Sequence, residues 1–167
     1  MKKLIRIAVG LIVCHLAGPA FAQSSATPQT DQGSRLRLQL SPYTEHFTYD
    51  AEHKDVLMLG LERETVDAKI DGMILFINSF GQPSAYLYPW GGVYHSIAGI
   101  KRLSFKWTAG LMYGYKEPYQ NKVPLNYKGF SLAAIPALAY EFTPGWSGQV
   151  NLLGTAGLML QLNVALN

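Results

Sequence analysis

The end of the chain alternates between two kinds of side chain. Leu158, Leu160, Leu162, Val164 and Leu166 occupy every second position, and polar, small or flexible side chains fill the positions between them. Successive side chains of a β-strand point to opposite faces, so strict alternation indicates a strand with two different faces. A chain built from such strands must place its two faces in two different environments.

The same period of two recurs after residue 34. Leu57, Leu59 and Leu61 alternate with other residue types, and the stretch from Leu103 to Tyr115 does the same over a greater length. Turn-forming residues separate these segments, and none has the period of a useful amphipathic helix. Eight segments fit the pattern, at residues 35–47, 55–63, 69–79, 84–96, 102–115, 131–142, 147–153 and 157–167.

This pattern predicts an all-β fold, an eight-stranded antiparallel transmembrane β-barrel of the outer-membrane type. A closed barrel has no free sheet edge and pairs its backbone groups, as lipid requires. A secreted, soluble β-sandwich would also alternate, but it does not explain an outer face as apolar as that of residues 102–115. We expect residues 35–167 to form one barrel domain and the protein to be a monomer.

The start of the chain has the layout of an export signal. Lys2, Lys3 and Arg6 make the start basic, and residues 4–17 are mostly apolar. Ala20-Phe21-Ala22 then provides a small-x-small cleavage site. The apolar run is too short to span a membrane. The sequence therefore predicts a signal peptide at residues 1–22 that is cleaved on export. A flexible polar leader follows at residues 23–34, and the barrel then places the protein in the outer membrane of a Gram-negative cell.

The single cysteine and the net charge both belong to this first segment. A lipid anchor on Cys14 is the alternative to cleavage after Ala22, although Val13 is bulky where a small residue is expected. Three basic residues of the signal account for the whole formal charge of +3. Without the signal the chain has no thiol and no charge excess, so its pI of 8.9 gives no reason to expect nucleic acid.

The inward-facing positions change character along the predicted barrel. Near the periplasmic end they are polar, and an unpaired charge there would be costly. We therefore expect Arg37 and Lys106 to pair with Glu62, Asp71 or Glu141. The polar set comprises Arg37, Gln39, Glu62, Asp71, Ser104, Lys106, Glu141, Gln149, Asn151, Gln161 and Asn163.

Near the outer end the inward-facing positions are apolar, small or flexible. Small barrels are filled by side chains or hold one small ligand, and methionine adapts to irregular apolar shapes. The pattern therefore predicts a slot for a flexible alkyl chain, or else a packed core without space. The expected slot lining is Met58, Met73, Leu75, Ile77, Gly110, Met112 and Met159.

Candidate catalytic residues lie at the ends of the first and third predicted strands. With the amino terminus in the periplasm, both strands finish at the outer rim, which brings His46 to the same rim as Asn78 and Ser79. A histidine within reach of a serine can act as a general base while the serine attacks or polarises an ester. Strict alternation turns Ser79 inward and His46 outward, unless a β-bulge near Pro42 reverses the histidine.

The stretches His46-Phe47-Thr48-Tyr49-Asp50 and Asn78-Ser79 resemble those of the lipid A palmitoyltransferase family, of which the chain would be a divergent member. In that family the second stretch is Asp-Ser. The resemblance implies transfer of an acyl chain from a phospholipid to the lipid A of lipopolysaccharide, without metal or cofactor. It implies that His46 is the general base, Ser79 the nucleophile or polarising hydroxyl, and Asn78 the orienting partner.

A non-catalytic barrel that stabilises the membrane or binds a hydrophobic ligand is the alternative function. His53 and His95 have no evident partner, and no spacing of ligand residues suggests a metal site. The longest outer loop, residues 116–130, is rich in lysine. Those lysines would either meet lipopolysaccharide phosphates or simply be solvated.

Overall fold

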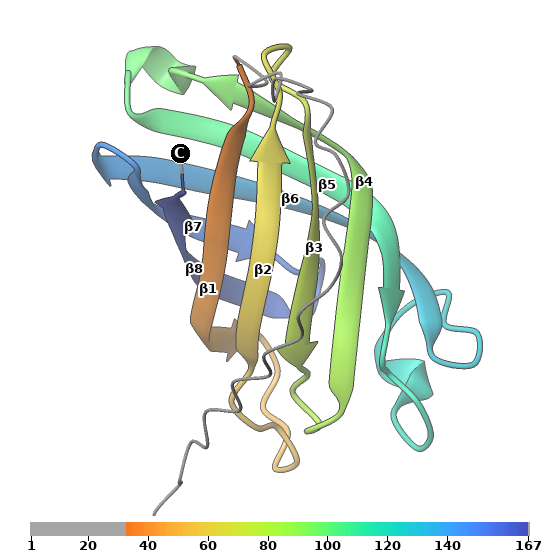
Figure 1. Ribbon diagram of the computed structural model, residues 1–167. Helices are drawn as coiled ribbons and strands as arrows, with labels where there is room; N and C mark the ends of the chain where they lie inside the picture. Colours follow the sequence, from red (N-terminus) through yellow and green to blue (C-terminus); the bar gives the residue numbers. More distant parts are fainter. Residues whose placement is uncertain (1–32, 167) are drawn as a thin grey trace, which may run out of the picture. The chain divides into compact units, whose positions relative to one another are not determined.

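A computed structural model describes residues 33–166 of the chain. Within this range the chain forms a closed antiparallel barrel of eight strands, in which each strand pairs with the next and the first pairs with the last. The all-β, eight-stranded barrel predicted from the alternation is thereby confirmed (Figure 1). The signal peptide predicted at residues 1–22, and all of the predicted leader except residues 33 and 34, lie outside the described residues.

The strands begin and end within a few residues of the predicted segments. Between them lie two short 3₁₀ turns, η1 (Ile97–Gly99) and η2 (Gln120–Lys122). No helix within residues 33–166 is long and apolar enough to cross a membrane. The strands are β1 (Arg35–His46), β2 (Leu57–Glu64), β3 (Ile70–Ile77), β4 (Pro83–His95), β5 (Leu103–Tyr113), β6 (Phe130–Thr143), β7 (Trp146–Leu152) and β8 (Gly157–Ala165).

The barrel has two differently built ends. Odd-numbered strands finish at the end that we call the His46 rim, and even-numbered strands finish at the opposite end, the His95 rim. Four connections lie at the His46 rim, namely L1 (residues 47–56), L2 (residues 78–82), L3 (residues 114–129) and a short turn at residues 153–156. They form the lower edge of the barrel in Figure 1.

A β-bulge interrupts β1 where its pairing with β8 shifts between Leu40 and Tyr43. An extra residue in one strand changes which side chains face inward beyond it. Ser41 is buried before the bulge, and beyond it Thr44 and His46 lie on the inner side, where both line a cavity. The bulge that would turn the histidine inward is therefore present.

A second bulge interrupts β4, where the pairing with β5 shifts between Leu87 and Trp90. Tyr88 is buried before it and Val93 is buried after it, so the inward set changes from even to odd positions. His95 belongs to the second set and reaches the inside of the barrel at its rim.

A charged network fills the His95 half of the lumen. Glu62 is 1% exposed, and its carboxylate accepts hydrogen bonds from Lys106 at 2.6 Å and from Gln39 at 3.1 Å. Arg37 lies 3.8 Å from Glu62 and 2.5 Å from Glu64. The expected pairing of both inward cations with Glu62 is confirmed, and Glu64 adds a partner that the sequence did not indicate.

The two other proposed anions do not pair with these cations. Asp71 was placed wrongly, since it faces outward and pairs at 2.9 Å with Arg63. Glu141 lines the inner side as expected, but it is exposed near the end of β6. The error for Asp71 arises because β3 carries a continuous apolar run, in which alternation does not distinguish the two faces. Glu141 lies two residues before the end of its strand, where the rim is open to solvent.

A chain of side-chain amides completes the polar filling. Gln149 donates to Asn151 at 2.6 Å, Asn151 donates to Gln161 at 2.9 Å, and Asn163 donates to Gln149 at 3.0 Å. Because β7 and β8 are adjacent, these inward positions face one another across the ladder. Burying polar groups that all form hydrogen bonds costs little free energy. These side chains can therefore fill and close the lumen at this level.

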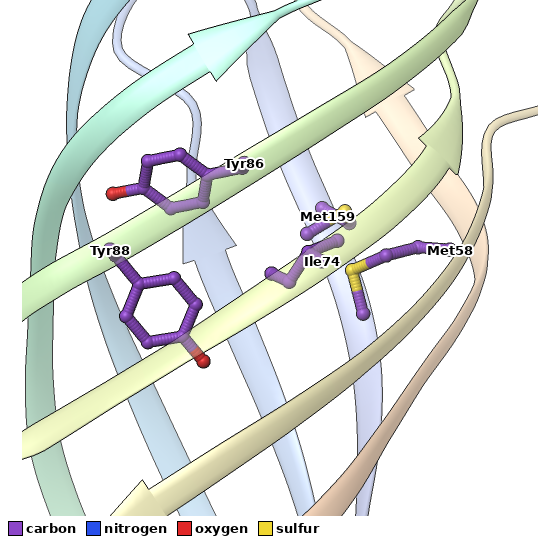
Figure 2. Packing of buried hydrophobic residues seen from close by; sticks show 5 residues of the cluster. All are labelled: Met58, Ile74, Tyr86, Tyr88 and Met159. Atoms are coloured by element: carbon purple, nitrogen blue, oxygen red, sulfur yellow. The ribbon is translucent and has the colours of Figure 1, made fainter.

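Between the polar filling and the His46 rim lies a small apolar cluster. Met58, Ile74, Tyr86, Tyr88 and Met159 pack together in the lumen and come from four different strands (Figure 2). The Tyr86 and Tyr88 rings stack with centroids 5.2 Å apart, and the Tyr88 hydroxyl donates to Gln39 of the charged network at 3.0 Å. This cluster separates the charged network from the His46 half of the barrel.

Candidate functional site at the His46 rim

A chamber of about 440 Å³ occupies the His46 half of the lumen. Met58, Met112 and Met159 line its wall together with Ile74 and Phe76, and Tyr86 contributes to its floor. These side chains come from β2, β3, β4, β5 and β8, which the barrel closure brings around one space. Of the two expectations for this half, open slot or filled core, the described residues form an open slot.

Three residues expected in the slot face the other way. Met73, Leu75 and Ile77 are 49%, 54% and 39% exposed, which places them on the outside of β3. Their neighbours Ile74 and Phe76 line the chamber instead. The prediction was one residue out of register because residues 73–77 are all apolar, so either face of β3 could have been the inner one.

Gly110 faces inward as expected but serves a different purpose from lining the slot. A Cβ at this position would lie 2.0 Å from the carbonyl oxygen of Leu87 and 2.6 Å from the Cα of Tyr88. These backbone atoms belong to the bulged part of β4. Glycine is therefore required for the close approach of two strands, and Gly110 does not line the chamber.

His46 lies in the chamber mouth as the last residue of β1. Its ring packs against that of His53 from L1, with centroids 4.0 Å apart and an interplanar angle of 31°. His53 in turn contacts Phe80 of L2 edge-on at 5.3 Å. No partner for His53 could be predicted from the sequence, because the contact depends on how L1 folds back over the rim.

Asn78 and Ser79 form the start of L2 and are both buried. The Asn78 side-chain oxygen accepts hydrogen bonds from the backbone N–H groups of Phe80 and Gln82, each at 3.0 Å, and its amide donates to Ser84 at 3.1 Å. This is an Asx turn, which fixes the β3–β4 connection. The structure places Asn78 as the residue that shapes the turn carrying Ser79, and no hydrogen bond links it to His46 in the described chain.

His46 and Ser79 line the same chamber, as expected from the direction of their strands. They are not hydrogen-bonded to each other within residues 33–166. The Ser79 side chain instead hydrogen-bonds with the phenol of Tyr115, whose pKa is raised mainly by burial. Thr44 also lines the chamber, and its hydroxyl oxygen is buried without a hydrogen-bond partner in the described chain. His46, Thr44 and Ser79 are therefore polar residues within the lining of a mostly apolar chamber.

The connections over the mouth are locked together. Lys122 of L3 pairs with Asp50 of L1 at 2.9 Å, and its ammonium lies 5.1 Å from the centroid of Phe80 in L2. Phe80 also stacks on Tyr119 of L3, with centroids 4.3 Å apart. The Glu52 N–H and the Lys122 ammonium hold the pKa of Asp50 below its usual value, and Asp50 raises that of Lys122. Lys122 therefore has a partner within the protein.

The barrel wall is incomplete beside the chamber. The β6–β7 ladder ends with Ala137 opposite Asn151, whereas β6 begins at Phe130. The Glu141 N–H donates to the carbonyl of Arg102, which directly precedes β5. Odd-numbered residues of β6 therefore direct their backbone groups toward β5, and even-numbered residues direct theirs toward β7. Pro136 is the next such residue, and it has no N–H to continue the ladder.

Residues 130–136 of β6 therefore border an opening in the wall, which we call the side opening. Leu132 and Ala134 are exposed on the outer side of β6, yet both also line the chamber. The short turn at residues 153–156 lines the chamber as well. The chamber is therefore accessible through the wall and at the rim.

The comparisons with known proteins add no identification to this geometry. No protein-family model matches the chain, and no curated protein matches it significantly. Among the described residues no group of three or more histidine, cysteine, aspartate or glutamate side chains is arranged to hold a metal ion.

Proposed function

We propose that the chamber at the His46 rim holds a fatty acyl chain. The observation that carries this proposal is a methionine-lined apolar space in the His46 half of a barrel whose other half is filled by polar side chains. Its volume of about 440 Å³ falls in the range of about 300 to 1,000 Å³ common for small-molecule sites. Methionine walls suit a flexible alkyl chain because their side chains adapt to its shape.

The outer surface of the barrel supports a location in the outer membrane, with the protein exported through a cleaved signal. Three successive outward side chains of β2, Leu57, Leu59 and Leu61, are apolar and are 61%, 52% and 47% exposed. A soluble barrel rarely exposes such a continuous apolar face. Exposed aromatic residues flank both ends, as in transmembrane barrels: Tyr94, Tyr140, Phe142 and Trp146 near the His95 rim, and Tyr43, Phe47, Tyr127 and Phe130 near the His46 rim.

The side opening supports a membrane lipid as the donor of the chain. A phospholipid could insert an acyl chain between residues 130–136 and the turn at residues 153–156 while its headgroup stays at the membrane surface. Leu132 and Ala134 are small or apolar at this passage and would not oppose it. In this proposal the His46 rim faces the outer leaflet, where lipid A of lipopolysaccharide is the acceptor.

The side chains at the mouth can support transfer of the acyl group. His46 would take the proton of an acceptor hydroxyl as that oxygen bonds to the ester carbonyl carbon, and would return it to the departing lysophospholipid oxygen. In this direct transfer Ser79 would polarise the carbonyl, in a turn whose shape depends on Asn78. With Ser79 as the nucleophile instead, its proton would pass through His46 to the departing lysophospholipid oxygen, and the acceptor hydroxyl would then displace Ser79 from the acyl-serine and return a proton to it. The balanced outcome is one ester formed and one broken, with no metal or cofactor required.

Mass spectrometry of lipid A from Gram-negative cells that express the protein tests this function. We expect an additional acyl chain with the wild type and none with His46→Ala or Ser79→Ala. Ser147→Ala is a matched control, because Ser147 is a serine on β7 near the His95 rim that does not line the chamber. An unchanged lipid A profile in wild-type cells, with the protein folded in the outer membrane, would refute the transferase.

A barrel that binds a hydrophobic ligand without transferring it is the second candidate. The specific observation in its favour is that His46 contacts His53 and Ser79 contacts Tyr115, while the two proposed catalytic residues are not bonded to each other. Native mass spectrometry of the purified protein would then reveal a retained lipid, and the lipid A profile would not change.

A further inference from the structure

A second group of reactive side chains lies at the other end of the barrel. At the His95 rim, the Ser104 hydroxyl is 3.0 Å from Nδ1 of His95, and Nε2 of His95 is 2.8 Å from the Glu64 carboxylate. All three side chains line one cavity of about 120 Å³, which is separate from the chamber. The acyl-transfer proposal makes no use of them.

The strand register brings these residues together. His95 and Ser104 are direct partners in the β4–β5 ladder, and Glu64 is the last residue of β2. The bulge in β4 between Leu87 and Trp90 decides that His95 belongs to the inward set at this rim. The arrangement therefore rests on the ladder and is not a contact between mobile loops.

The charges fix the direction of the hydrogen bonds. Arg37 lies 2.5 Å from the second oxygen of Glu64, which favours the ionised carboxylate. An ionised carboxylate only accepts hydrogen bonds, so Nε2 of His95 carries the proton that it donates to Glu64. In the neutral ring Nδ1 then has a free electron pair, and the Ser104 hydroxyl donates to it.

We propose that this rim is a second catalytic site that hydrolyses small carboxylic esters. A nucleophile held by a base, with the base oriented by a third group, is the arrangement by which serine hydrolases activate serine. Here the two ring nitrogens have exchanged roles relative to the usual order. Ser104 is the nucleophile, His95 is the general base, and Glu64 is a positioning residue.

The reaction balances without any co-reactant except water. Ser104 Oγ bonds to the ester carbonyl carbon while its proton passes to Nδ1 of His95. The ester C–O bond breaks, the alcohol leaves with that proton, and an acyl-serine remains. Water then attacks the acyl-serine, gives one proton to His95 and releases the carboxylic acid, after which that proton returns to Ser104.

The cavity indicates the class of ester. Its volume of about 120 Å³ leaves space for a short acyl group and excludes a long alkyl chain. Arg35 and Arg102 line the same cavity beside Glu141, and their guanidinium groups favour an ester that carries an anionic group. The substrates of this site therefore differ from those of the chamber in both length and charge.

Labelling with a fluorophosphonate, followed by peptide mass spectrometry, tests the site in the full-length protein purified in detergent. We expect modification of Ser104, and a labelling rate that falls about 100-fold or more in His95→Gln, the size of a typical general-base effect. Ser131→Ala is the matched control, because Ser131 is a buried serine on β6 that does not line this cavity, and its loss should leave the rate unchanged. Hydrolysis of p-nitrophenyl acetate should exceed that of p-nitrophenyl palmitate and should disappear in Ser104→Ala.

The positioning role of Glu64 has its own measurement. Glu64→Gln should slow labelling of Ser104, and Glu64→Asp should restore part of the rate if the folded barrel persists by circular dichroism. Folded wild type without label on Ser104, or with equal labelling in His95→Gln, would overturn the proposal. Because the peptide map separates Ser104 from Ser79, and the lipid A profile does not depend on Ser104, this proposal and the acyltransferase can fail independently.

Discussion

His53 packs against His46 at the chamber mouth, with ring centroids 4.0 Å apart, and also makes an edge-to-face contact with Phe80, with centroids 5.3 Å apart. The His46 ring therefore has one neighbour that comes from L1 and is itself held by L2. Since His46 ends a strand and has no hydrogen bond in the described chain that fixes its ring, this stacking is what orients it.

Loss of His53 should reduce acyl transfer without abolishing it. An aromatic ring pair contributes about 0.5 to 1.5 kcal/mol, so His53→Ala should lower the rate between about two- and ten-fold. His53→Phe keeps a ring in place and should retain most of the activity. Quantitative lipid A mass spectrometry measures both variants, and a complete loss in His53→Phe would show that the second imidazole has a chemical role.

The buried pair of Lys106 and Glu62 should dominate the stability of the His95 half. Lys106→Met leaves the Glu62 carboxylate, which is 1% exposed, without its closest cation and should cost about 3 to 5 kcal/mol. Urea unfolding of the barrel in detergent micelles measures this change. The double variant Lys106→Met with Glu62→Gln should recover part of the loss, because no buried carboxylate then remains at that site.

The exposed pair of Arg63 and Asp71 provides the control for that experiment. It spans 2.9 Å, but its side chains are 53% and 36% exposed, so Arg63→Met should cost no more than about 1 kcal/mol. Equal destabilisation by both single variants would contradict the assignment of Lys106 and Glu62 to the interior.

Gly110→Ala should destabilise the barrel by about 1 to 3 kcal/mol, since the new Cβ would meet the Leu87 carbonyl oxygen at 2.0 Å. The nearest atom to a Cβ at Gly148 is 4.0 Å away, so Gly148→Ala should have little effect. The unfolding midpoints of the two variants give the comparison. A neutral result for Gly110→Ala would mean that β4 and β5 separate more easily than the bulge suggests.

The ion pair between Asp50 of L1 and Lys122 of L3 should weaken at both extremes of pH. The pKa of Asp50 is lowered, so its contribution to the stability of the folded loops is complete above the ordinary carboxyl pKa. That contribution is lost as pH falls through the lowered value. The pKa of Lys122 is raised, so its contribution is complete below the ordinary ammonium pKa and is lost as pH rises through the raised value. Hydrogen exchange of L3 should thus be faster in Asp50→Asn than in wild type at neutral pH. That difference should vanish in strong acid, and a difference independent of pH would exclude the ion pair as its cause.

Alternation predicted the fold because most strands carry two chemically different faces. Leu57, Leu59 and Leu61 against Met58 and Glu62 leave only one assignment of inside and outside. The run of apolar residues at 73–77 carries no such contrast, and there the assignment was wrong. Tyr86 and Tyr88 were also beyond prediction, because β4 changes its inward set at a bulge that its sequence does not mark clearly.

The site was predictable to the extent that strand direction determines it. Topology alone brings His46 and Ser79 to one rim, and both line the chamber. Whether His46 faced inward depended on the bulge at Ser41 and Pro42, which local pairing with β8 decides. The partners of His53 and His95 arise from a loop fold and from cross-strand register, neither of which a single sequence specifies.

The gap beside β6 also bears on how deep the barrel sits in the proposed membrane. Backbone groups of residues 130–136 that do not pair with β7 would each be costly in hydrocarbon, where no water can bond to them. That cost is least where lipid headgroups and water reach the wall. We therefore expect Pro136 to lie close to the boundary between the hydrocarbon and the headgroup layer. In that case the position of one proline sets how deeply the whole barrel is inserted.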